Sequence, residues 1–299
     1  MKENIPEFLY EILIKEYGED ITKNIIEGYS IKRPTTFRIN TVKTDVSSVK
    51  DTLLKLGINF KRVEWNENAI ISEDEFDIRK TSLYENGEIY IQNLSSMIPP
   101  IVVNPKEGES ILDMAAAPGG KTTQMASLSK NKAMITACEK NKIRAERLKY
   151  NLEKQGAGRV NIMLEDARKL SDFFSFDKIL LDAPCSGSGT INIKDKNLEK
   201  YYTQELLTRS IKTQKELLRK ATKIVKQKGE IIYSTCSILK EENENQVKEI
   251  LEKANLEIVP INETDFKGVQ LLPVQIPGTI CVCPNELYEG FFVAKMRKK

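Results

Sequence analysis

The sequence predicts an α/β protein whose main domain is a largely parallel, doubly wound sheet. From Gly108 onward, short runs of apolar residues alternate with segments of helical spacing, as is typical of parallel strands joined by helices. The predicted strands cover residues 110–114, 133–138, 160–164, 178–182 and 230–234. Predicted helices begin at Gly120, Lys142 and Tyr202. Such sheets bind ligands beyond the carboxyl ends of their strands, so functional residues are expected at that edge.

Smaller elements are expected before and after this sheet. Residues 1–28 have helical spacing that is interrupted at Gly18 and Asp20. The next segments predict strands and one helix closed by Gly57, over 37–42, 46–56, 60–65 and 69–72. Near the end of the chain, 257–259 and 290–296 are expected to add edge strands. The expected organisation is a helical segment, a small α+β domain and the main domain, over residues 1–28, 29–92 and 93–299.

The composition excludes several kinds of protein. Histidine is absent, which removes serine–histidine triads and most zinc sites, so proton transfer must use Asp, Glu, Lys, Cys or water. The five cysteines form no disulfide framework, and Cys281 and Cys283 lack a second ligand pair, so no metal is predicted. No apolar run is long enough to cross a membrane, and no signal-peptide pattern is present. We expect a cytoplasmic protein without a membrane partner, and assume a monomer.

The charge pattern leaves two interpretations open. The net charge of +3 is too small to establish a polyanionic partner. Basic residues nevertheless gather in 140–149 and in 209–228. A solvated helix face explains each run as well as contact with nucleic acid does.

A loop of small residues follows the first strand of the main domain. It reads Ala115-Ala116-Ala117-Pro118-Gly119-Gly120-Lys121 and leads into a predicted helix. Small side chains let a ligand approach the backbone closely, and the first turn of a helix offers free N–H groups. The spacing fits neither the dinucleotide fingerprint nor the phosphate loop. An ordinary tight turn remains the alternative.

Acidic residues end the next two strands. Glu139 is placed to accept bonds from ribose hydroxyls, and Asp166 could meet an adenine amine. Each acid alone fits a solvated loop residue. Together with the small-residue loop they predict an adenosine ligand without phosphates, and hence S-adenosylmethionine as the cofactor. The predicted cofactor-binding residues are 115–121, Glu139, Arg144, Asp166 and Asp182.

Two cysteines lie in separate loops of the main domain. Cys185 lies in Asp182-Ala183-Pro184-Cys185 and Cys236 in Thr235-Cys236-Ser237. A thiolate that adds to carbon 6 of a pyrimidine makes carbon 5 able to attack a methyl donor. The Asp-Ala-Pro-Cys loop differs from the Pro-Pro-aromatic tetrapeptide of amino-methylating enzymes. Chemistry alone does not choose between the two thiols, and burial as a small hydrophobe, expected for Cys138, is the usual alternative.

With Arg38-Ile39-Asn40-Thr41, the small-residue loop and the two cysteine loops, the chain resembles the Sun/Nop-type (RsmB/RsmF-like) RNA (cytosine-5) methyltransferases over about residues 30–299. The resemblance implies methyl transfer from S-adenosylmethionine to carbon 5 of a cytosine in rRNA or tRNA. It also implies a Rossmann-like class I methyltransferase fold preceded by a small RNA-recognition-like domain carrying Arg38, Lys43, Lys61 and Arg62. By motif, Cys236 is the nucleophile and Cys185 assists product release.

Several points of this hypothesis stay open. Asp182 is expected near ring nitrogen 3, where partial burial would let it donate a proton. Lys121 could contact the substrate or the thiolate, or be solvated. The base that removes the carbon-5 proton is either Cys185 or water. The main alternative function is a catalytically silent RNA-binding ribosome-assembly factor with the same fold, and a second is a methyltransferase acting on DNA or a small molecule. The sequence does not indicate which RNA position is modified, or how many.

Overall fold

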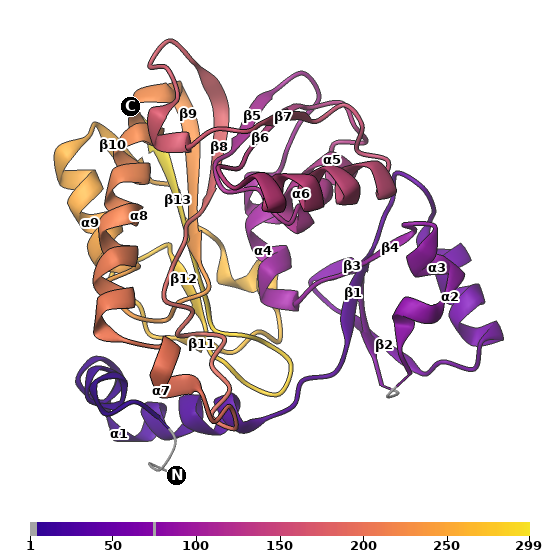
Figure 1. Cartoon of the computed structure of the whole chain (residues 1–299), viewed down its shortest axis with the longest axis horizontal. Coiled ribbons are helices and arrows are strands. Elements are labelled where there is room, and N and C mark those ends of the chain that lie inside the picture. The colour runs from indigo at the N-terminus through magenta and orange to yellow at the C-terminus, as the bar shows by residue number, and fades with distance from the viewer. Residues whose placement is uncertain (1–4, 74–75) are drawn as a thin grey trace.

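The computed structural model describes residues 5–73 and 76–299. It contains a four-stranded sheet and a nine-stranded sheet, joined by the segment that leads into helix α4, Leu94–Val103 (Figure 1). The smaller sheet belongs to the N-terminal part of the chain. The predicted helical segment 1–28 lies partly outside the described residues, which begin at Ile5.

Helix α1, Glu7–Ser30, is two helical pieces joined at Gly18, whose φ of 76° and ψ of 175° are not helical. The interruption predicted at this glycine is therefore present. Leu9, Leu13 and Ile25 of the helix are fully buried in the same core as the large sheet. The N-terminal helix thus packs on the main domain, at its lower edge in Figure 1.

The small sheet has the strand order β2-β3-β1-β4, with every neighbouring pair antiparallel. Its elements follow one another as strand, helix, strand, strand, helix, strand: β1 Thr36–Ile39, α2 Val46–Lys55, β2 Phe60–Val63, β3 Asn66–Ser72, α3 Ser82–Glu85 and β4 Ile89–Ile91. Phe37 and Ile39 of β1 face α2, where they pack with Val49 and Leu53 in a separate core. Arg38 faces the other way and is also buried, because that side of the sheet lies against the main domain.

The large sheet has the order β11-β12-β13-β9-β8-β5-β6-β7. Five of its strands are parallel: β5 Ser110–Asp113, β6 Met134–Cys138, β7 Asn161–Met163, β8 Phe176–Asp182 and β9 Val225–Thr235. The order along the chain reverses between β5 and β8, and this is the position where doubly wound sheets bind ligands. The α/β prediction, with a small α+β domain ahead of a mostly parallel sheet, is confirmed.

The last strand was expected at an edge and lies inside the sheet instead. β13, Phe291–Lys298, pairs antiparallel with β9 on one side and with β12, Ile280–Val282, and β10, Leu256–Ile258, on the other. β12 in turn pairs with β11, Leu271–Leu272. β10, β11 and β12 were not all expected because strands of two or three residues are too short for alternation to be recognised in the sequence.

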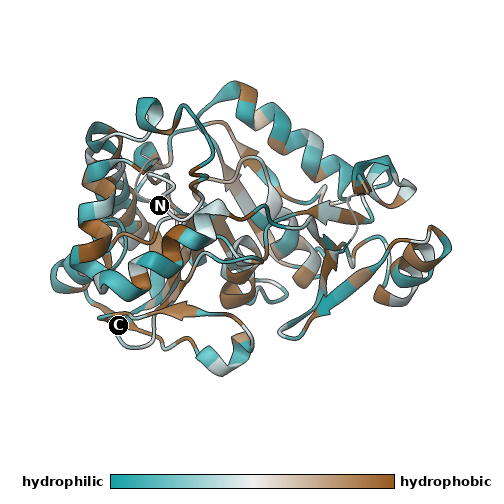
Figure 2. Ribbon diagram, turned by 90° about the horizontal axis from the view of Figure 1, so that it is seen from below, coloured by the Kyte–Doolittle hydropathy of each residue, from teal (hydrophilic) through white to brown (hydrophobic). Residues whose placement is uncertain are grey.

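Helices cover both faces of the large sheet. One face packs with α1, α8 (Gln204–Ile224) and α9 (Glu244–Lys253) in one hydrophobic core. The other packs with α4, α5 (Gly120–Leu128) and α6 (Lys142–Lys154) in a second. The remaining elements are short: the one-turn α-helix α7 (Leu198–Tyr201) and the 3₁₀ helices η1 (Ile78–Lys80), η2 (Ala167–Lys169) and η3 (Glu263–Phe266). Apolar residues lie along the inner strands and hydrophilic ones along the outer helix faces (Figure 2). No described helix is long and apolar enough to cross a bilayer.

Candidate active site

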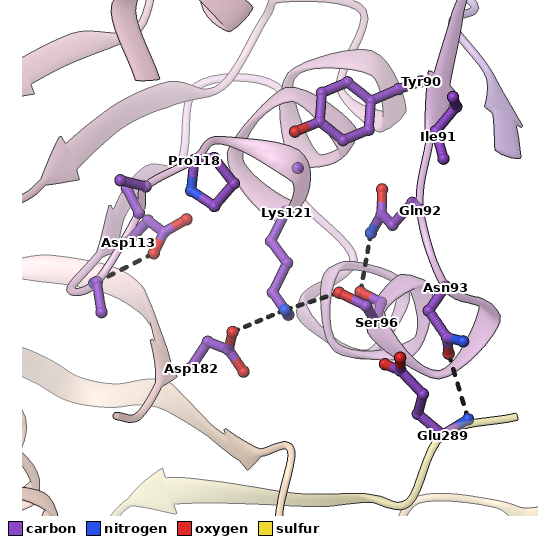
Figure 3. Close-up of a pocket in the computed structure, with 14 residues that line it drawn as sticks. Tyr90, Ile91, Gln92, Asn93, Ser96, Asp113, Pro118, Lys121, Asp182 and Glu289 are labelled. Carbon is purple, nitrogen blue, oxygen red and sulfur yellow. Dashed lines mark hydrogen bonds and ion pairs between the residues drawn. The ribbon is translucent and has the colours of Figure 1, made fainter. Parts of the chain in front are cut away.

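A pocket of about 290 Å³ lies at the carboxyl ends of β5 and β8 (Figure 3). Four parts of the chain enclose it: the end of β5 with the small-residue loop that follows, the end of β8, the segment from β4 into α4, and Glu289, just before β13. Its lining is Tyr90, Ile91, Gln92, Asn93, Ser96, Asp113, Ala115, Ala116, Ala117, Pro118, Gly120, Lys121, Asp182 and Glu289. The small domain and the main domain therefore build this pocket together.

The small-residue loop lies against this pocket and begins helix α5. Gly119 has a φ of 108°, and a Cβ added there would lie 2.9 Å from Leu148 Cδ1, so this position requires glycine. Gly120 is the first helical residue, and its free N–H group belongs to the positive end of the helix. The loop predicted from small residues thus has the backbone geometry of a ligand cradle.

Asp113 anchors the loop from below and was not among the predicted site residues. It is 1% exposed, and its carboxylate accepts bonds from Thr122 Oγ1 (2.7 Å) and the Ala115 N–H (3.4 Å). Burial, reinforced by the charge of Asp182, raises the pKa of Asp113 to about 6, against the opposing effect of the bond from Thr122. An acid at the end of the first parallel strand was the sequence signal that could have identified it.

A second, smaller cavity of about 40 Å³ shares Ala115 with the first. Glu139, Arg144 and Asp166 line it. Of the predicted cofactor-binding residues, all except Gly119 line one of the two cavities. The structure therefore brings this set to one continuous edge of the sheet, as the convergence of parallel strands requires.

The two acids of the second cavity, Glu139 and Asp166, have different hydrogen-bond partners. Glu139 is 3% exposed and accepts a bond from the Asn141 N–H at 2.8 Å. Arg144 lies 3.4 Å from Glu139 and donates to the Ala117 carbonyl at 2.7 Å. Both carboxylate oxygens of Asp166 accept bonds from Arg168, and these bonds lower the pKa of Asp166 to about 2. A ligand amine would share an Asp166 oxygen with Arg168.

An ion pair crosses the main pocket. Lys121 Nζ lies 2.7 Å from Asp182 Oδ2 and donates to Ser96 Oγ at 2.8 Å, while Ser234 Oγ donates to Asp182 Oδ1 at 2.8 Å. Burial alone would lower the pKa of Lys121, but the Asp182 carboxylate and the nearby Cys236 raise it. Lys121 is therefore a stable ammonium, and its position beside Asp182 decides against the solvated alternative.

The two loop cysteines meet although 51 residues separate them. Their sulfur atoms are 2.9 Å apart, both thiols are free, and both side chains are partly exposed. The hydrogen bond with Cys236, together with burial, raises the pKa of the Cys185 thiol well above its usual value. Cys185 is therefore a neutral thiol in contact with Cys236.

Contacts between the backbones fix the two cysteine loops together. The Gly189 N–H donates to the Cys236 carbonyl at 2.9 Å, and the Gly290 N–H donates to the Gly189 carbonyl at 2.8 Å. A Cβ on Gly189 would lie 2.0 Å from the Gly290 oxygen, so no larger residue fits. Ser188 Oγ and Ser237 Oγ add a hydrogen bond of 2.7 Å.

Glu242 supports the Cys185 loop from behind and was not predicted. It is fully buried and accepts bonds from the Ser186 N–H (2.7 Å), Ser186 Oγ (2.5 Å) and Gln214 Nε2 (3.0 Å). Gln214 also donates to the Pro184 carbonyl at 3.0 Å. Glu242 lies within the charged stretch 240–244, which by itself resembles a solvated surface.

Arg38 and Asn40 do not face solvent, so an RNA-facing role for Arg38 is wrong. Arg38 is 2% exposed, donates to Gln92 Oε1 (3.0 Å) and Thr123 Oγ1 (2.5 Å), and lies over the Tyr90 ring. Asn40 Nδ2 donates to the Gln155 carbonyl at 2.8 Å. This motif joins the small domain to the helices of the cofactor side. The reason is that the outer face of β1 packs on the main domain.

The remaining cysteines and cations have structural environments. Cys138, Cys281 and Cys283 are buried, as expected for the first. Within 5–73 and 76–299, no group of three or more Cys, Asp or Glu side chains could hold a metal ion. Several cations of the run 209–228 are paired with acids on neighbouring elements, at Glu249, Asp172 and Asp177. These pairs favour a solvated helix face for that run.

Two protein-family models match the chain. The model described as 16S rRNA methyltransferase RsmB/F matches residues 100–297, and that of the RsmF/B-like ferredoxin-like domain matches residues 5–79. The chain belongs to the RsmB/F methyltransferase family. This is the family that the motifs indicated, and the ferredoxin-like topology is that of the small sheet.

Individual relatives agree with this assignment. A tRNA (cytosine(49)-C(5))-methyltransferase of Pyrococcus abyssi is 32% identical over 95% of this chain and 98% of its own length. A human 28S rRNA (cytosine(4447)-C(5))-methyltransferase is 35% identical over 91% of this chain and 35% of its own. The crystal structure of a methyltransferase homologue from Pyrococcus horikoshii superposes with a TM-score of 0.83 at 31% identity, covering 99% of this chain and all of that one. Several curated relatives are longer, and the chain spans 35% to 66% of their length.

Proposed function

We propose that this protein transfers a methyl group from S-adenosylmethionine to carbon 5 of a cytosine in RNA, either ribosomal or transfer RNA. The observation that carries the proposal is the contact of Cys185 with Cys236, 2.9 Å apart, on the same edge of the sheet as the Lys121–Asp182 pair. Attack on carbon 6 requires a thiol, and activation of the ring requires a proton donor at nitrogen 3. This arrangement offers both.

The residues of the two cavities fit the cofactor. Glu139 is buried with a carboxylate that can accept ribose hydroxyls, and Asp166 lines the smaller cavity, where it could meet an adenine amine. All residues of 115–121 except Gly119 line the main pocket. Arg144 and Asp182 complete the proposed set. S-adenosylmethionine, when bound, supplies an electrophilic methyl group. The protein's part is to hold the donor and the base in line.

The proposed chemistry begins at Cys236. Its thiolate forms a bond to carbon 6, and the displaced electron pair is stabilised by a proton that Asp182, once protonated, gives to nitrogen 3. The Lys121 ammonium, 2.7 Å from Asp182, keeps its own proton and stabilises the carboxylate that results. Carbon 5 then takes up the methyl group, whose former carrier would leave as a neutral thioether. A base, Cys185 or water, takes the carbon-5 proton, the electron pair left behind breaks the bond between sulfur and carbon 6 and restores the thiolate, and nitrogen 3 returns its proton to Asp182. Cys185 lies within contact of Cys236 and is the group proposed to assist this release.

The setting of the reaction follows from the same residues. Because the mechanism needs two free thiols, we propose that the protein works in the reducing environment of the cytoplasm. A monomer is the proposed working unit, since one chain provides every residue named. Residues 1–28, 29–92 and 93–299 are proposed as the helical segment, the small domain and the catalytic domain. RNA is expected to enter where the small and main domains meet, with its target base unstacked.

Methyl transfer from labelled S-adenosylmethionine tests the function directly. Unmodified total rRNA and tRNA are offered separately, and the products are digested to nucleosides. Label in 5-methylcytosine from one of the two RNAs supports the proposal and identifies the substrate class. RNA binding without label transfer, combined with no affinity for the cofactor, would instead favour a catalytically silent assembly factor. Transfer to DNA in preference to RNA would contradict the proposed substrate.

A further inference from the structure

The main pocket contains five carboxyl or amide side chains, and four of them already accept hydrogen bonds. Each such bond occupies acceptor capacity that a substrate amine would otherwise use. The acceptors already engaged are Gln92, Asn93, Asp113 and Asp182, which take bonds from Arg38, Ser95, Thr122 and Lys121. The fifth is Glu289, and among the described residues its carboxyl has no hydrogen-bond or ion-pair partner.

The position of Glu289 is fixed although its carboxyl is free. Its N–H donates to Asn93 Oδ1 at 3.4 Å, and its carbonyl accepts from Ser95 Oγ at 2.7 Å. The next residue, Gly290, is bonded to Gly189 of the Cys185 loop. The side chain faces the same space as Lys121 and Asp182 (Figure 3). Burial raises the pKa of Glu289, while Arg33 and Lys121 act in the opposite direction.

The geometry of a pyrimidine determines what this acceptor can meet. Carbon 6, the point of thiol attack, lies opposite nitrogen 3, and the exocyclic amine is attached to carbon 4, next to nitrogen 3. If Asp182 meets nitrogen 3, the amine lies beside it in the same pocket. An amine conjugated with the ring is a hydrogen-bond donor, so it needs an acceptor oxygen there.

We propose that the Glu289 carboxylate accepts this amine and thereby selects cytosine over uracil. The inference rests on the proposed function, because it assumes that the pocket receives a pyrimidine. Uracil has a carbonyl oxygen at carbon 4. This oxygen and the carboxylate oxygen are both hydrogen-bond acceptors, so no hydrogen bond can form between them. A site built to bond a substrate group rejects an analogue that lacks it, because its own polar atom is then left unpaired.

The test measures discrimination between bases, which a purely structural role would not change. The RNA that accepts methyl groups in the assay above is prepared with cytosine, uracil or pyrimidin-2-one, which lacks the amine, at the target position. Competition binding is measured with Cys236→Ala protein, so that no covalent adduct forms. We expect cytosine to bind about tenfold more tightly than pyrimidin-2-one. In Cys236→Ala/Glu289→Ala this preference should fall to within about twofold.

Two controls separate the alternatives. Glu289→Gln keeps a carbonyl oxygen at the same position and should retain most of the preference for cytosine. Affinity for S-adenosylmethionine should be unchanged in both variants, since a weakened affinity would show that Glu289 serves the cofactor's amino group and would overturn the proposal. An unchanged base preference in Glu289→Ala, or no preference with Glu289 present, would also overturn it. If the wild-type protein methylates no RNA, the proposed function is contradicted, and the role of Glu289 in base selection falls with it. The other outcomes contradict only the role of Glu289.

Discussion

Replacing Lys121 by methionine is expected to destabilise the folded protein by about 2 kcal/mol. The Lys121 side chain is 13% exposed and that of Asp182 is 27% exposed, with 2.7 Å between their charged atoms. Removing one partner of a buried pair costs about 3–5 kcal/mol, whereas an exposed pair contributes about 0–1 kcal/mol. Because water reaches part of Asp182, we place the cost between these ranges. Methionine keeps the length of the stem, so packing is little changed.

Urea unfolding measures this cost, and a matched surface pair provides the control. Lys132 lies 2.8 Å from Glu107, but their side chains are 53% and 70% exposed, so Lys132→Met should change stability by less than about 0.5 kcal/mol. Adding Asp182→Asn to Lys121→Met should recover at least about 1 kcal/mol, because the neutral amide needs no cation. Lys121→Met protein as stable as wild type, or strictly additive effects of the two single changes, would show that the Lys121–Asp182 pair does not stabilise the fold.

Three further changes test other parts of the structure. Gly189→Ala places a Cβ 2.0 Å from the Gly290 oxygen and should cost about 2–3 kcal/mol in urea unfolding and abolish methyl transfer, whereas Gly158→Ala, with no neighbour within 4 Å, should do neither. Arg38→Met removes buried hydrogen bonds to the main domain and should lower the melting temperature without changing the salt dependence of RNA binding. Asp113 has a folded-state pKa of about 6 against an ordinary value of 3.8. Wild type should therefore lose up to about 3 kcal/mol of stability relative to Asp113→Asn as the pH rises from about 4 to 6, because the unfolded chain releases this proton first.

Each of these results has an outcome that would contradict it. A functional, stable Gly189→Ala protein would mean that the two cysteine loops do not need their close backbone approach. A reduced salt slope in Arg38→Met would return this arginine to the RNA surface. Parallel stability curves for wild type and Asp113→Asn between pH 4 and 7 would show that burial does not hold the proton on Asp113.

The regular part of the fold was predictable because each parallel strand is an apolar run followed by a helix of clear periodicity. The strand predicted over 230–234 shows the limit of that signal. β9 begins at Val225, and the next three residues, Lys226, Gln227 and Lys228, are polar and at least partly exposed, so they give no apolar run. Helix α4 was missed for another reason: it contains Pro99 and Pro100, which interrupt a helical pattern in sequence.

The candidate site was predictable where residues share the carboxyl edge of the sheet, and not where they depend on packing between distant segments. Glu139, Asp166 and the two loop cysteines follow strands, so topology alone brings them together. Glu242 and Glu289 approach the site from other segments, and their burial depends on tertiary contacts. Arg38 was expected at the surface but is buried. An alternating strand pattern predicts one covered face, and it does not show that the second face is covered as well.

The covalent mechanism is tested most directly by a denaturing gel of protein and RNA after reaction with S-adenosylmethionine, comparing wild type, Cys185→Ala and Cys236→Ala. If Cys236 attacks the base and Cys185 assists release, Cys185→Ala accumulates a covalent protein–RNA adduct, while Cys236→Ala forms neither adduct nor 5-methylcytosine. Normal methylation by Cys236→Ala would contradict the covalent mechanism. An adduct in Cys236→Ala, with none in Cys185→Ala, would reverse the roles of the two thiols.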